Sequence, residues 1–391
     1  MEFILFALTL ACVAIFHRHT LAAALAGLVA ITLYKLAVTG FHAGTGLTGL
    51  VGHFAAEWVV LANLFALLTG FALLARHFED SRIPLALPAL LPDDWTGGVA
   101  LLALVFVLSG FLDNIAAAMI GGTMAASVYR SRVHIGYLAA IVAAANAGGA
   151  GSVIGDTTTT MMWIEGVRAV EVLHAYVAAA AAFLLFAIPA SRVQQRFAPI
   201  TRDMPASLAI DWARATIVGL ILLAAIATNV YVNLRHPELA DRGPFLGLAV
   251  WLGIAGTALW RRPAWSLLPE SARGSVFLLA LVACASMMPV EELPAPSWHS
   301  ALGLGFISSV FDNIPLTKLA LEQGGYDWGI LAYAVGFGGS MIWFGSSAGV
   351  AIASRFPEAR SVGAWLRHGW FVVLAYVAGF FALLGVLGWR P

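Results

Sequence analysis

A run of glycines, hydroxyl side chains and one carboxylate interrupts an apolar stretch of this sequence between Asn146 and Ile164. Glycines such as Gly151 and Gly155 weaken helix propagation by roughly 1 kcal/mol each relative to alanine. A carboxylate at the centre of a bilayer, as expected for Asp156, costs on the order of 3 kcal/mol. Irregular backbone is tolerated at membrane depth where it lines a cavity or is buried in protein. We interpret this stretch as a broken helix that holds a small cation or a polar solute. A glycine-packed helix crossing with a paired or protonated Asp is the alternative.

A short acidic motif occurs twice in the chain. The segment Ser109-Gly-Phe-Leu-Asp-Asn-Ile-Ala116 matches Ser308-Ser-Val-Phe-Asp-Asn-Ile-Pro315, so that Asp113 aligns with Asp312. Inverted repeats with broken segments in corresponding positions are typical of secondary transporters, whose binding sites lie near the bilayer midplane. Each copy of the motif is followed by a glycine and hydroxyl break, at Gly151-Ser152 and Gly155-Asp-Thr157 in the first half and at Gly339-Ser340 and Gly345-Ser-Ser347 in the second.

These residue types suit a site for Na⁺ or Li⁺, because hard cations favour carboxylate, carbonyl and hydroxyl oxygens. Loss of hydration favours the protonated form of a carboxyl group, whereas a bound cation favours the ionised form. One carboxylate can therefore hold either a proton or a metal ion. Asp113 and Asp312 could alternatively serve only as helix caps. The candidate metal ligands are Asp113, Asp156 and Asp312, and the wider cation- and proton-binding set adds Asn114, Asn146, Thr157, Asn313, Ser340 and Ser346.

Lys318 is a further charge expected below the membrane surface. It could pair with an aspartate, attract an anionic substrate, or extend its stem towards the outer face. His53 and Glu57 have i, i+4 spacing near the outer side. They could sense pH, because histidine titrates near neutrality, and solvation at the interface is the alternative.

The composition fixes the class of protein. Of 391 residues, 61% are hydrophobic and 11% are charged, whereas soluble domains carry about 25% charged residues. The sequence therefore predicts an all-α polytopic membrane protein whose first partner is the lipid bilayer. The formal net charge is zero and no basic tail occurs, which argues against a nucleic-acid partner. Cys12 and Cys284 form no metal or disulfide pattern, and we expect no cofactor apart from the transported ions. We expect the apolar N-terminal segment to be a retained span.

Apolar runs along the chain predict its organisation. We expect a first inverted repeat at 1–190, a polar connector at 191–214 and a second inverted repeat at 215–391. Each repeat would hold about five crossings, one re-entrant helical hairpin and one broken transmembrane helix. The hairpins are expected at about 97–129 and 299–325, and the broken helices at about 135–167 and 328–354. Ordinary spans are expected near residues 2–16, 21–39, 57–75, 172–190, 215–232, 244–260, 274–288 and 369–388.

Arginine positions orient these segments by the positive-inside rule. The connector, with Arg192, Arg196 and Arg202, would lie in the cytoplasm. No lysine or arginine occurs from Gly274 to Thr317, which fits an outer loop at 289–298. The two hairpins must then enter from opposite faces, which gives the two halves opposite topology. The other arginines that mark the cytoplasmic side are Arg76, Arg82, Arg130, Arg132, Arg261, Arg262, Arg273, Arg355, Arg360 and Arg367.

The motifs resemble those of the ion-transporter (ArsB/NhaD permease) superfamily, and most of all those of NhaD-type sodium/proton antiporters. The superfamily also includes arsenite permeases and Na⁺-coupled dicarboxylate and citrate carriers. The resemblance implies two hairpins, two broken helices, a homodimer and an elevator-like movement of the transport core. The stretches that carry it are Asp113-Asn114-Ile, Asn146-Ala-Gly-Gly-Ala, Ile-Gly155-Asp156-Thr-Thr-Thr-Thr160-Met-Met-Trp163-Ile, Asp312-Asn313-Ile-Pro315 and Gly339-Ser340 with Gly345-Ser-Ser-Ala-Gly349.

We therefore expect a secondary transporter of the cytoplasmic (inner) membrane rather than an enzyme, exchanging Na⁺ or Li⁺ for H⁺. The alternatives are a Na⁺-coupled di- or tricarboxylate carrier and an arsenite or oxyanion permease. A non-transporting membrane scaffold descended from a carrier is a further reading. An intramembrane aspartyl protease is disfavoured, because Val153-Ile-Gly-Asp156 lacks the Gly-x-Gly-Asp pattern and Leu112 stands where a tyrosine is expected.

Overall fold

The protein consists of helices throughout the described part of its chain. A computed structural model describes residues 1–16, 19–86, 91–201, 209–236, 239 and 242–391, and these contain no β-strand beyond one isolated bridge between Phe41 and Gly44. Within these ranges six helices are long and apolar enough to cross a membrane. The predicted multi-pass helical membrane protein is thereby confirmed. The six segments are Thr20–Thr39, Gly46–Asp80, Ala169–Phe197, Trp212–Val232, Trp265–Ser286 and Trp370–Leu387.

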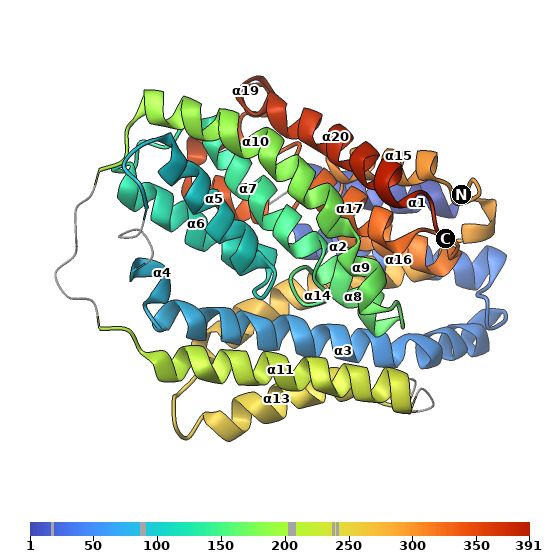
Figure 1. Ribbon diagram of the computed structural model, residues 1–391. Coiled ribbons are helices and arrows are strands. Elements are labelled where there is room, and N and C mark those ends of the chain that lie inside the picture. Colours follow the sequence, from blue (N-terminus) through green and yellow to red (C-terminus); the bar gives the residue numbers. More distant parts are fainter. Residues whose placement is uncertain (17–18, 87–90, 202–208, 237–238, 240–241) are drawn as a thin grey trace.

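The helices form two groups, and Figure 1 shows α3, α11 and α13 of the first group along the lower edge of the molecule. The α3 bundle is held together by contacts of the long helix α3 with α11, α13 and α14, and α14 in turn contacts α2. Both halves of the sequence therefore contribute to this bundle. Its helices are α1 (Glu2–Ile15), α2 (Thr20–Tyr34, continued by a π-helical turn, Lys35–Thr39), α3 (Gly46–Asp80), α11 (Trp212–Arg235), α13 (Phe245–Thr257) and α14 (Leu268–Ser286).

The second group, the α7 bundle, surrounds two helices of small apolar residues, α7 and α17. Every residue from Gly136 to Ala150 of α7 and from Gly329 to Gly338 of α17 is buried. Small side chains let helix backbones approach closely where no water competes. Its members are α5 (Trp95–Ser109), α6 (Asn114–Val128), α7 (Ile135–Ala150), α8 (Thr157–Ile164), α9 (Ala169–Leu173), α10 (Ala175–Phe197), α15 (Trp298–Ser308), α16 (Asn313–Gln323), α17 (Trp328–Gly338), α18 (Ser347–Arg355), α19 (Val362–His368) and α20 (Trp370–Leu387). The short α4 (Ile83–Ala86) follows α3, and 3-10 turns lie at Trp265–Leu267, Val290–Glu292 and Pro357–Arg360.

Four interruptions lie inside the ranges that the sequence predicts. The pairs α5/α6 and α15/α16 break at 110–113 and 309–312, and the pairs α7/α8 and α17/α18 break at 151–156 and 339–346. Equivalent close contacts recur in the two halves. A Cβ added at Gly149 would lie 2.7 Å from the Gly155 carbonyl oxygen, and one at Gly339 would lie 2.7 Å from that of Gly345. These matched contacts support a repeat, while its inverted orientation and the re-entrant course of the hairpins stay predictions.

Several helix boundaries differ from the predicted spans, most of all those of α3 and α10. Helix α3 begins at Gly46, well before residue 57, and α10 continues to Phe197, beyond residue 190. The predicted spans include only the apolar part of each helix, because they were drawn from hydropathy. A helix can continue beyond its apolar part into polar sequence. The connector is correspondingly shorter than 191–214, and its residues 202–208 lie outside the described part of the chain.

Gly148 sits at the tightest point between α7 and α5, because an added Cβ would overlap the carbonyl oxygen of Phe106. We expect Gly148→Ala to destabilise the protein by about 1–3 kcal/mol, since the two backbones must separate. Thermal unfolding of the detergent-purified protein measures this. Gly219→Ala in α11 is the matched control, because nothing lies within 4 Å of its added Cβ. A Tm for Gly148→Ala equal to that of the control would contradict the close packing.

Candidate cation site

Four helices of the α7 bundle begin at the interruptions, and each is capped by an oxygen of its preceding residue. The Asp113 carboxylate accepts from Ile115 N at 2.8 Å, Asp156 Oδ1 from Thr158 N at 3.2 Å and Asp312 Oδ1 from Ile314 N at 3.0 Å. Ser346 Oγ accepts from Gly349 N at 3.3 Å. Helix N-termini leave backbone N–H groups without partners, and side-chain oxygens satisfy them. Capping therefore occurs at all three aspartates, and it occupies only one oxygen of each.

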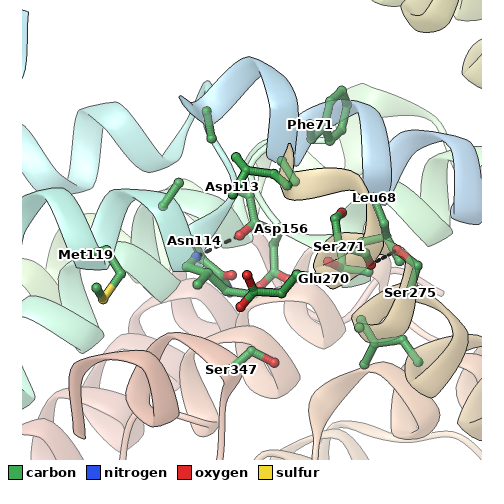
Figure 2. Close-up of a pocket in the computed structure, with 18 of the residues that line it drawn as sticks. Leu68, Phe71, Asp113, Asn114, Met119, Asp156, Glu270, Ser271, Ser275 and Ser347 are labelled. Atoms are coloured by element: carbon green, nitrogen blue, oxygen red, sulfur yellow. Dashed lines mark hydrogen bonds between the residues drawn. The ribbon is translucent and has the colours of Figure 1, made fainter. Parts of the chain in front are cut away.

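A cavity of about 490 Å³ lies between the two bundles, and the first residue of each of these four helices lines it. Figure 2 shows Asp113, Asn114, Asp156 and Ser347 on one side of the cavity. Leu68 and Phe71 of α3 and Ser271 and Ser275 of α14 lie across from them. The lining continues along α3 as far as Arg76 and Glu79, and the Arg76 side chain is half exposed. The cavity thus connects the acidic side chains with the end of the molecule where Arg76, Arg214 and Arg261 gather around Asp80 and Asp211, here called the arginine-rich end.

Two polar atoms beside this cavity are buried without a hydrogen-bond partner. They are Oδ2 of Asp156, a residue that is 2% exposed, and Nδ2 of Asn313, a residue that is 4% exposed. Buried polar groups normally have partners, so exceptions indicate a functional role. An oxygen of a carboxylate in such a position can accept a proton or coordinate a cation.

Asn146 plays a different part, because its amide is fully engaged. Its Nδ2 donates to Ser340 Oγ at 2.9 Å and to Ser346 Oγ at 3.0 Å, and its Oδ1 accepts from Asn114 Nδ2 at 3.1 Å. Asn146 is fully buried and does not line the cavity. It therefore links α6, α7 and the break between α17 and α18 at one point.

The predicted site residues separate into two sets. Those that line the cavity are Asp113, Asn114, Asp156, Thr157 and Asn313, whereas Asn146, Asp312, Ser340 and Ser346 lie behind them. Among the described residues, no group of three or more His, Cys, Asp or Glu side chains is arranged to hold a metal ion. Sequence reasoning did not identify the wall contributed by α14, which includes Glu270, Ser271 and Ser275. In the sequence, this part of α14 is distinguished only by a few polar residues at the start of an apolar run.

Lys318 pairs with glutamates and not with an aspartate, which was one of the possibilities that the sequence left open. Lys318 is 1% exposed, so it does not extend to the outer face either. Its Nζ lies 2.9 Å from Glu57 Oε2, 2.6 Å from Glu165 Oε1 and 2.8 Å from Glu322 Oε1. His53, expected next to Glu57, is buried, and its Nε2 lies 3.1 Å from Ser286 Oγ. Three glutamates from three segments thus surround one ammonium group.

The helices and their buried polar interruptions define the chain as a multi-pass helical membrane protein. No family model matches the sequence. It is 26% identical to sodium/proton antiporter 1 of Arabidopsis thaliana over 324 residues, 72% of this chain and 54% of that protein. It is 27% identical to the Na⁺/H⁺ antiporter NhaD of Vibrio parahaemolyticus, over 64% of this chain and 71% of that protein. NhaD of Vibrio cholerae is also 27% identical, over 70% of this chain and 67% of the relative. The resemblance to NhaD-type sodium/proton antiporters is thereby confirmed, although the match spans about half the length of the Arabidopsis relative.

Removal of the Asn146 amide should lower stability more than removal of the Asn114 amide. Asn146→Ala leaves three buried polar groups without this partner, and each unsatisfied group costs about 1–3 kcal/mol. Asn114→Ala breaks only one of the three bonds. Thermal unfolding of both variants in detergent compares them directly. Equal decreases in Tm for the two variants would show that the hydrogen bonds from Asn146 to Ser340 and Ser346 add nothing to the stability.

Proposed function

We propose that the protein exchanges Na⁺ or Li⁺ for H⁺ across the cytoplasmic (inner) membrane. The observation that carries this proposal is the buried Oδ2 of Asp156, which lacks a partner and belongs to a residue in the wall of a cavity open to one end of the molecule. The curated relatives, which are sodium/proton antiporters by name, point to the same activity. Exchange follows when a proton and a cation compete for the same carboxylate, so that one leaves as the other binds.

Asp156 is the central residue of this proposal, with Asp113 and Asp312 as further acidic groups. Asp113 and Asp156 line the same cavity, and Asp312 directly precedes Asn313 in its wall. Neighbouring carboxylates titrate as a coupled set, so that no proton is assigned to one residue alone. Asn313 and Thr157 would complete the oxygen ligands at the cavity, because hard cations favour such oxygens. Asn114, Asn146, Ser340 and Ser346 would position these ligands. The transported ions are the substrates, and no resident cofactor is part of the proposal.

Anion transport is less well supported. The alternatives, a carboxylate carrier and an oxyanion permease, would use Lys318 to attract an anionic substrate. Lys318 instead contacts three carboxylates, so its charge is more than neutralised before any substrate arrives. Asp113 and Asp156 in the cavity wall would also repel an anion.

We propose the orientation from the positions of the arginines, and the assembly from the resemblance to NhaD-type antiporters. We place the arginine-rich end and the connector after α10 in the cytoplasm. The structure would then have its site open to the cytoplasm. A homodimer and an elevator-like movement of the α7 bundle against the α3 bundle belong to the proposal through the resemblance to NhaD-type antiporters.

Asp156→Asn should abolish exchange and leave the fold intact. Asparagine caps a helix as well as aspartate does, so the start of α8 is retained while the titratable charge is lost. Dequenching of a ΔpH-sensitive dye in everted vesicles, with Na⁺, Li⁺, K⁺ and citrate added in turn, measures exchange. We expect Na⁺ and Li⁺ to give a response in the parent and none in the variant.

The matched control is Asp94→Asn at the exposed start of α5. Asp94 also caps a helix, accepting from Thr96 N at 2.9 Å, but it lies outside the cavity. Exchange should be unchanged there. Near-normal exchange by Asp156→Asn would rule out this site, and a response to citrate alone would favour the carboxylate carrier.

A further inference from the structure

The ion cluster around Lys318 joins the two helix bundles at the end of the molecule opposite to the cavity mouth. Lys318 and Glu322 lie on α16 and Glu165 directly follows α8, so three members belong to the α7 bundle. Glu57 alone comes from the α3 bundle. It stands eleven residues before Leu68, where the cavity lining begins on α3, which corresponds to roughly 16 Å along a helix.

The directions of the helices separate the cluster from the cavity. Helices α8 and α16 start directly after Asp156 and Asp312 and lie side by side, and Glu165 follows the end of α8 while Glu322 lies in the last turn of α16. Along α3 the cavity lining extends the other way, from Leu68 to Glu79. The acidic site therefore lies between an open end and an end that the ion cluster covers.

A layer of apolar side chains fills the space between the site and the cluster. It comprises parts of α3, α8, α14 and α16, so it also spans the two bundles. Such a layer excludes water and ions, and it must part if the site is to open at this end. Its buried members are Leu64, Met161, Leu278, Val282 and Ile314, and Leu61 and Leu321 pack against them.

The chemistry of the cluster allows its single contact across the bundles to break at low cost. A lysine ammonium has three N–H donors, and in this structure three carboxylates surround it. If α3 moves away, Lys318 keeps Glu165 and Glu322 within its own bundle. Glu57 then meets water in the space that opens, so neither charge is left buried without a partner, the situation that is most costly for buried ion pairs.

We propose that the contact between Glu57 and Lys318, with the apolar layer beneath it, is the gate that closes the transport path at the end opposite to the cavity. The gate holds the two bundles together while the site is open at the arginine-rich end. It breaks each time the site turns to the other side. This proposal rests on the proposed function in one respect, because it requires transport by alternating access. It does not depend on which ion or solute is transported.

Labelling of a cysteine in the cavity tests the gate without reference to the substrate. Ser271→Cys, in a background with Cys12→Ser and Cys284→Ala, places the reporter in the cavity wall. The rate of its reaction with a fluorescent maleimide is measured on purified protein in detergent, where both ends are accessible. Glu57→Gln should slow this reaction by about threefold or more, because loss of the bridge shifts the population away from the state with an open cavity.

Glu165→Gln is the matched control, because it removes the same charge from the same ammonium but leaves the bridge to α3. Its labelling rate should stay within about twofold of the parent's, since a change confined to one bundle favours neither state. An unchanged rate in Glu57→Gln, or equal slowing in both variants, would overturn the proposal. If the parent protein shows no exchange of Na⁺ or Li⁺ for H⁺ but the labelling rates follow the expected pattern, the result counts against the proposed function and not against the gate.

A second measurement keeps all four charged residues and so covers the case in which Glu57→Gln does not fold. Leu61→Cys on α3 and Leu321→Cys on α16 place one thiol in the apolar layer from each bundle. Joining them with a reducible bifunctional thiosulfonate should stop ion exchange in proteoliposomes, and a reductant should restore it. Exchange that continues across the joined thiols would show that the two bundles need not separate at this end.

Discussion

Helices that begin inside a membrane must find partners for their first backbone N–H groups without water, and this requirement shapes the centre of the protein. Asp113, Asp156, Asp312 and Ser346 meet it by capping the helices that follow them. A carboxylate has two oxygens, and capping needs only one. The same residues that make interrupted helices possible therefore leave oxygens available for a proton or a cation. The candidate site is in this sense a consequence of the fold.

The two halves share contacts but differ in the residues that carry charge. When Gly149 is matched with Gly339 through their equivalent contacts, Asp156 corresponds to Ser346 and Asn146 to Gly336. In one half a hydroxyl caps α18 and is held by Asn146. In the other half a carboxylate caps α8, and a Cβ at Gly336 would lie 3.5 Å from Asp156 Oδ2. The two broken helices therefore share a backbone arrangement, but only the break at 151–156 ends on a carboxylate, and that carboxylate lies next to Gly336.

The sequence predicted the interruptions because glycine, aspartate and threonine are conspicuous in apolar segments, and all four breaks lie where expected. It failed where the determining contacts join distant segments. Only Glu322, one helical turn after Lys318, could be related to it by spacing. Glu165 follows a short helix and Glu57 lies on α3, so nothing in the local pattern indicates that they meet. The start of α3 at Gly46 was missed for another reason, because hydropathy identifies the apolar part of a helix and not its full length.

The surroundings of Lys318 also bear on how a cation can reach the site. A lone ammonium in the membrane interior would repel Na⁺ or Li⁺ over a long range, because charges interact strongly where the effective dielectric constant is low. Three carboxylates around one ammonium reverse the sign of the local charge when they are ionised. The cluster then attracts cations at its end of the molecule, as Asp113 and Asp156 do at the cavity. A buried lysine, which from sequence alone could suggest an anion carrier, is therefore compatible with a cation path through its three glutamate partners.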